Sequence, residues 1–87
     1  MLSLTEKGQI IQEAIDVYIP FSAELHEIAK ICHLPLLKKD LLASGWAEIS
    51  TKVLKPHAIN PESEIGVNLY HNFTNTLVRL GHIRSVN

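Results

Sequence analysis

The stretch Asn60-Pro61-Glu62-Ser63-Glu64 is the clearest helix start in the chain, and it opens an apolar pattern that runs to Gly81. An asparagine side chain can accept backbone N–H groups that a helix start leaves unpaired, and proline suits the first helical position. The acids that follow favour the positive end of the helix dipole. The apolar side chains behind this signal recur at three- and four-residue spacing: Ile65, Leu69, Phe73, Leu77 and Leu80. The sequence predicts a helix over about residues 61–80, ended by Gly81, with Ile83 packing back.

A second helix start lies at the N-terminus. Ser3-Leu4-Thr5-Glu6 matches the capping box, in which the serine oxygen and the glutamate carboxylate satisfy backbone N–H groups. Pro20 lacks the N–H that a continuing helix needs. We therefore expect a first helix over about residues 4–19. Its apolar face consists of Leu4, Ile11, Ala14, Ile15 and Tyr18.

Three shorter helices are expected between these two. Ser22 is an N-cap for a helix that should end near His33, because Pro35 disfavours helical angles at the residue before it. The next helix should reach Gly45, which is placed as a left-handed stop. Residues 46–54 have helical spacing, although residues 49–53 are rich in β-branched side chains and are also compatible with an extended segment. Residues 55–59 form a loop in this interpretation.

Five short amphipathic helices with tight connections predict an all-α fold, a compact bundle formed by a single helical domain over residues 1–87. Hydrophobic residues make up 46% of the chain and charged residues 20%, which is typical of a globular domain. Each apolar stripe must be buried against another. The predicted core contains Leu4, Ile11, Ile15, Leu25, Ile28, Cys32, Leu41, Trp46, Leu69, Phe73, Leu77 and Leu80.

Catalytic and metal-binding patterns are absent from the sequence. His26 and His33 are seven residues apart, or about 10 Å along a helix, which is too far for joint chelation of one ion. The chain has no nucleophile elbow, phosphate-binding glycine loop or zinc-protease motif. We therefore expect no enzymatic activity, no metal and no cofactor. One cysteine, no signal sequence and no apolar run near 20 residues favour a cytoplasmic protein outside the membrane.

Charge is distributed unevenly along a chain whose net charge is only −1. Residues 1–29 carry one lysine against five acids, whereas residues 30–55 carry five lysines against two acids. Opposite charges on different surfaces would allow a weak, salt-sensitive head-to-tail contact, with a second copy or with another protein. The candidate interface residues are Glu13, Asp16 and Glu24 on one side and Lys38, Lys39 and Lys52 on the other. The alternative is that these residues form the solvated faces of a monomer.

A helix-turn-helix is the alternative interpretation of the centre of the chain. Residues 24–46 contain two expected helices, a short turn and lysines on the second helix, and Ala29 supplies the usual small residue. His33 stands where the turn normally has glycine, and Lys39 stands where the recognition helix normally buries an aliphatic side chain. A small DNA-binding regulator is therefore the second hypothesis, after a protein-interaction module.

The two ends of the chain carry a family resemblance. At the N-terminal end it rests on IIQEAIDVY (10–18), a proline-marked turn and AELHEI (23–28), and at the C-terminal end on LYHNF (69–73) and LVRLGHI (77–83). These stretches resemble the bacterial effector-associated domains, which are small helical adaptors of the death-like type. The resemblance does not extend to residues 34–60. It implies a non-enzymatic adaptor at the N-terminus of a signalling or conflict protein, recruiting an effector through like-with-like contacts.

Overall fold

The capping box at the N-terminus forms as the sequence predicts. In the computed structural model, which describes residues 3–81, the Ser3 hydroxyl accepts a hydrogen bond from the backbone N–H of Glu6 at 3.1 Å. This cap starts the helix α1 (Leu4–Cys32), which ends where His33 takes a left-handed conformation with a φ of 55°. The predicted start at Leu4 and the predicted end near His33 are both confirmed.

Pro20 does not end a helix, so the prediction of two separate helices before His33 is wrong. α1 is one helix of 29 residues with Pro20 inside it. The proline removes the hydrogen bond that would reach the Asp16 carbonyl. Pro20 and Asp16 are both exposed, so water can hydrate that carbonyl. The residues that follow, from Ala23 to Ala29, include good helix formers, and they carry the helix onward.

Gly45 does not stop a helix either, because it lies inside α2 (Lys38–Ile49). It is buried against Tyr18, and a Cβ atom added at Gly45 would lie 2.7 Å from the Tyr18 ring. Glycine is needed here for the close approach of α1 and α2. The helical prediction for residues 46–54 is confirmed, since α2 continues directly into η1 (Ser50–Leu54), a π-helical turn.

The last helix, α3 (Glu64–Arg79), starts three residues later than predicted. Ser63 is the N-cap, and its hydroxyl accepts the backbone N–H of Gly66 at 3.2 Å. The Asn60 side chain accepts the N–H of Glu62 at 2.9 Å instead, which forms a turn before the helix. The predicted start signal therefore does precede a helix, but Ser63 and not Asn60 is the N-cap.

The end of α3 matches the prediction. Gly81 has a φ of 79°, the left-handed conformation expected just past a helix. Ile83, expected to pack back, lies outside the described residues. Residues 3–81 form three α-helices and one π-helical turn, without a strand in that part of the chain, so the all-α class is confirmed and the count of five helices is wrong.

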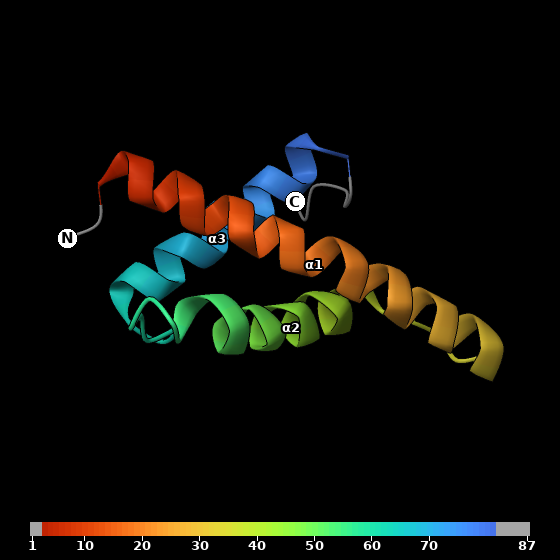
Figure 1. Cartoon of the computed structure of the whole chain (residues 1–87). Coiled ribbons are helices and arrows are strands. Elements are labelled where there is room, and N and C mark those ends of the chain that lie inside the picture. The colour runs from red at the N-terminus through yellow and green to blue at the C-terminus, as the bar shows by residue number, and fades with distance from the viewer. Residues whose placement is uncertain (1–2, 82–87) are drawn as a thin grey trace.

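The core lies where the first half of α1 meets α2, η1 and α3 (Figure 1). Its buried members are Ile10, Ala14, Ile15, Tyr18, Leu41, Leu42, Ile49, Val53, Leu54, Leu69, Phe73 and Leu77. Three predicted core residues pack only partly against this cluster: Ile11, Leu25 and Trp46. Four others are exposed, and their assignment to the core is wrong: Leu4, Ile28, Cys32 and Leu80. These four lie near the ends of α1 and α3, where no helix in the described part of the chain covers them.

Candidate protein-binding surface

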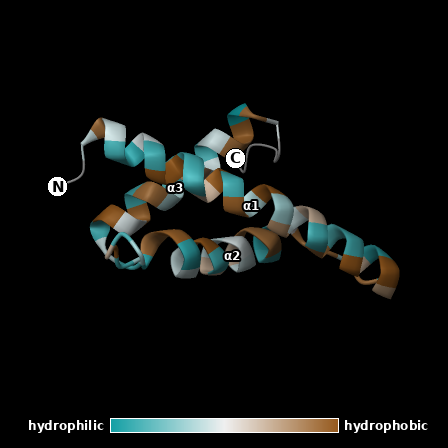
Figure 2. Ribbon diagram, viewed as in Figure 1, coloured by the Kyte–Doolittle hydropathy of each residue, from teal (hydrophilic) through white to brown (hydrophobic). Residues whose placement is uncertain are grey.

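The second half of α1 extends past the body of the molecule. Figure 1 shows the last turns of α1 reaching beyond the start of α2. We call residues 21–32 the arm. Large aliphatic side chains are exposed on the arm and on the connection that leads back to α2, with exposed fractions of 74% for Ile31 and 63% for Leu34. Ile28 and Leu37 are also exposed, and Figure 2 shows hydrophobic ribbon at the tip of the arm.

The apolar side of the arm continues a stripe that begins in the core. From Ile11 to the end of α1, positions with alternating three- and four-residue spacing are apolar: Ile11, Ala14, Tyr18, Phe21, Leu25, Ile28 and Cys32. This is the heptad spacing that keeps one helix face against a partner. Tyr18 is buried, Leu25 is half-buried and Ile28 is exposed. The stripe thus leaves the core gradually, and its far end has no cover among the described residues.

A groove of about 380 Å³ lies between α1 and the junction of α2 with η1. We call it the arm groove. Its apolar wall comes from α1 and its opposite side is charged; the lining residues are Val17, Pro20, Phe21, Glu24, Leu25, Ile28, Glu48 and Lys52. A groove with an apolar wall and a few charges is typical of sites that receive an amphipathic helix.

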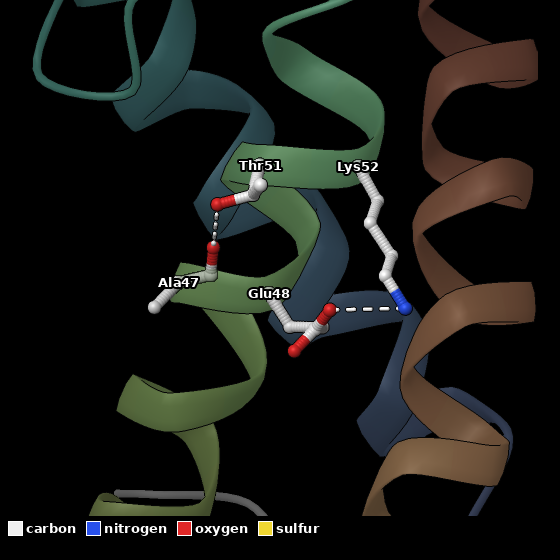
Figure 3. Close-up of polar contacts among 4 residues, drawn as sticks. All are labelled: Ala47, Glu48, Thr51 and Lys52. Atoms are coloured by element: carbon white, nitrogen blue, oxygen red, sulfur yellow. Dashed lines mark hydrogen bonds and ion pairs between the residues drawn. The ribbon is translucent and has the colours of Figure 1, made fainter.

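The π-helical turn places the charged side of the arm groove. Lys52 on η1 forms an ion pair with Glu48 at 3.0 Å, and Figure 3 shows its side chain on the side of η1 that faces α1. The hydroxyl of Thr51 donates to the Ala47 carbonyl at 3.1 Å, also drawn in Figure 3, and Ser50 donates to the Trp46 carbonyl at 2.7 Å. These side-chain bonds supplement the backbone pattern where the helix widens.

The predicted acidic interface residues take three different roles. The Glu13 carboxylate lies 2.9 Å from the His57 ring nitrogen, which ties α1 to the loop after η1. Asp16 accepts a hydrogen bond from the Gln12 side chain at 3.0 Å on the same helix. Glu24 alone of the three lines the arm groove. Glu13 and Asp16 therefore have local partners, and only Glu24 belongs to the apolar surface.

The predicted basic residues are also separated by the fold. Lys52 lines the same groove as Glu24, so these two charges share one surface instead of lying on different ones. Lys39 is exposed in the first turn of α2. The side chain of Lys38 lies outside the described part of the structure. The sequence missed the exposure of Ile31, Leu34 and Leu37. Ile31 lies beside the heptad stripe and the two leucines lie after the end of α1, so the stripe alone does not point to them.

A second and larger groove lies at the other end of α1. We call it the terminal groove; it has a volume of about 680 Å³ and lies between the first turns of α1 and the last turns of α3. Among the described residues that line it, Lys7 and Arg79 are charged. Leu4 and Leu80 form exposed apolar parts of the same lining.

Two aromatic residues singled out by the sequence hold the helices together. The Tyr18 ring packs edge-on against Phe73 with centroids 5.3 Å apart, and its buried hydroxyl has no hydrogen-bond partner among the described residues. Burial is the main cause that raises the pKa of Tyr18 above its usual value, and the neighbouring Tyr70 adds to the rise. Trp46 is half-buried, with its ring 5.1 Å from Tyr70 and 5.5 Å from Phe73. Both rings therefore serve the packing of α1, α2 and α3.

Over residues 3–81, the fold does not gather three His, Cys, Asp or Glu side chains in an arrangement that could hold a metal ion. None of the helices in that range combines the length and hydropathy needed to cross a bilayer. Comparisons with protein-family models, with curated proteins and with solved structures found no match to this chain.

Proposed function

We propose that this chain is a non-enzymatic protein-interaction module whose docking surface is the arm together with the arm groove. The observation that carries the proposal is the apolar stripe of α1, which is buried at Tyr18 and exposed at Ile28, with the exposed Ile31 beside it. Exposed aliphatic surface costs about 25 cal/mol per Å² compared with burial, so a cluster of such side chains favours a partner.

The partner best suited to this surface is an amphipathic helix. Ile28 and Ile31 lie three residues apart on one side of the arm, and Leu25 leads from them into the groove. A helix placed along the groove would bury these side chains and meet Glu24 and Lys52 at its edges. Such a role agrees with the adaptor function that the resemblance to effector-associated, death-like domains implies, in which the N-terminal domain of a bacterial signalling or conflict protein recruits an effector.

The balanced charges of α2 disfavour the alternative function of DNA binding. A recognition helix needs cations for the phosphate backbone. α2 carries Lys38 and Lys39, but Asp40 and Glu48 balance them, and Glu48 pairs with Lys52 just beyond the helix. We therefore favour a protein partner.

A pull-down with the purified protein, from a lysate of the cells that produce it naturally, tests this proposal. Ile28→Ser/Ile31→Ser should abolish capture of the proteins that the wild type retains, because it removes apolar contacts without touching the core. The matched control is Val67→Ser, an exposed aliphatic on α3 at 44% exposure that lies outside both grooves. Circular dichroism would verify that the variants fold.

A titration with duplex DNA at low and high salt completes the test. The account predicts no salt-sensitive binding to DNA. Micromolar or tighter binding that weakens as salt rises would contradict the proposed function. Equal capture by the wild type and by Ile28→Ser/Ile31→Ser would contradict the assignment of the arm.

A further inference from the structure

The terminal groove has the opposite charge to the arm. Among residues 3–81, its charged lining residues are Lys7 from the first turns of α1 and Arg79 from the last turn of α3, and no acid from that range lines it. Arg79 also donates to the Thr76 hydroxyl at 3.2 Å, which holds its guanidinium beside the groove. The groove thus presents two cations to an incoming ligand.

Apolar side chains accompany these cations. Leu4 is 87% exposed and Leu80 is 58% exposed, and both line the terminal groove above the half-buried Ile11. A binding partner for this groove should therefore carry two acids and two aliphatic side chains on one face. A single small anion would leave both leucines uncovered.

The arm carries such a face. Glu24, Glu27, Ile28 and Ile31 are spaced i, i+3, i+4 and i+7, which places them on one side of the helix within about two turns. All four residues are exposed. Among the described side chains, which do not include that of Lys38, Lys52 pairs with Glu48 and the His57 ring contacts Glu13, and neither contact includes Glu24 or Glu27.

We propose that the terminal groove of one molecule binds the arm of a second copy, which deepens the proposed function and rests on it. One helix carries both surfaces, and Lys7 and Glu24 are 17 residues or about 26 Å apart along α1. An arm therefore cannot reach its own groove. Carboxylates of one copy meet Lys7 and Arg79 of the next, and Ile28 and Ile31 cover Leu4 and Leu80.

This contact joins two different surfaces and is therefore heterologous. Repetition of a heterologous contact gives open strings or rings instead of closed dimers. Its charge pairs lie at the rim and are exposed, so the association is weak and sensitive to salt. The sequence also predicted a head-to-tail contact, but through different residues: of the six residues named there, the proposed contact keeps only Glu24, and it adds Glu27, Lys7 and Arg79.

A charge-swap experiment tests the contact. Sedimentation velocity of wild type over a range of concentrations should show association at low salt that declines at high salt. Lys7→Glu/Arg79→Glu and Glu24→Lys/Glu27→Lys should each raise the dissociation constant at least about ten-fold. An equimolar mixture of the two variants should associate again, because each reversed surface then faces a complementary one.

The matched control is Lys39→Glu/Lys55→Glu, which makes the same change in net charge at exposed residues outside the terminal groove. It should associate like the wild type. A wild type that stays monomeric at every concentration, a mixture that does not recover, or an equal loss in the control would each overturn the inference. A monomer whose partner capture still depends on Ile28 and Ile31 would leave the proposed function standing and remove only the second copy as occupant.

Discussion

The two halves of α1 carry the same apolar stripe and differ in what covers it. From Ile10 to Tyr18, α2, η1 and α3 pack against the helix and bury Ile10, Ala14, Ile15 and Tyr18. From Phe21 onward, only α2 and η1 lie alongside, and the cover ends before Ile28. The same apolar stripe therefore stabilises the fold in its first half and is available for binding in its second half.

The difference shows that apolar spacing identifies a helix face without identifying its neighbour. Ala14 and Ile28 occupy the same position of the heptad stripe, 14 residues apart, yet the first is 1% exposed and the second 47% exposed. Burial depends on the lengths of the neighbouring helices. α1 has 29 residues, whereas α2 has 12 and α3 has 16, so α1 is longer than either neighbour can cover.

The largest contrast is expected between Phe73 and Ile31. Phe73 is fully buried, and Phe73→Ala should cost about 3–5 kcal/mol, enough to unfold so small a domain. Ile31→Ala removes an exposed side chain and should change the free energy of unfolding by no more than about 0.5 kcal/mol. Thermal and urea denaturation followed by circular dichroism would measure both. A Phe73→Ala protein as stable as the wild type would contradict the assigned core.

A smaller contrast is expected between two glycines of the helices. A Cβ atom at Gly45 would collide with the buried Tyr18 ring, so Gly45→Ala should destabilise the protein by about 1–3 kcal/mol. Gly8 has no atom within 4 Å of the corresponding position, so Gly8→Ala should stabilise by about 0.5–1 kcal/mol through helix propensity. Urea denaturation compares the two, and equal effects would show that α1 and α2 do not approach closely at Gly45.

The smallest effect is expected at the buried hydroxyl of Tyr18. This hydroxyl has no partner among the described residues, so Tyr18→Phe should be neutral or should stabilise by up to about 1 kcal/mol near neutral pH. Chemical denaturation would measure the difference. A large destabilisation would show that the hydroxyl has a hydrogen bond in solution.

The same substitution changes the dependence of stability on alkaline pH. Because the pKa of Tyr18 is raised in the folded protein, the unfolded chain releases this proton first, above about pH 10. The wild type should therefore lose stability as pH rises past that value, and Tyr18→Phe should lose less. Denaturation of both proteins at neutral and alkaline pH checks this, and parallel pH curves would contradict it.

The sequence predicted the fold class and the helix ends from short-range chemistry. Ser3 caps α1, His33 ends it and Gly81 follows α3, because capping depends on residues within one turn. The predictions that Pro20 and Gly45 end helices were wrong for a different reason. Their effect depends on solvent at Pro20 and on the Tyr18 ring at Gly45, which are consequences of packing.

The candidate site was predicted only in part. Glu24 and Lys52 do line a groove, but their presence in the same one depends on the angle at which α1 passes η1. Lys7 and Arg79 line the same groove because the first turns of α1 lie near the last turns of α3, although these residues are far apart in the chain. The spacing of residues within one helix does not predict which residues of another helix lie beside it.

The central claim is that α1 is one helix through Pro20, with an arm beyond the body. The single cysteine, Cys32, is exposed and allows one spin label, and Thr5→Cys, also exposed, allows a second. Pulsed electron paramagnetic resonance on the doubly labelled protein should give one distance near 40 Å, because 27 residues of continuous helix span about that length. A distance below about 20 Å would mean that the chain folds back at Pro20, and it would contradict the account.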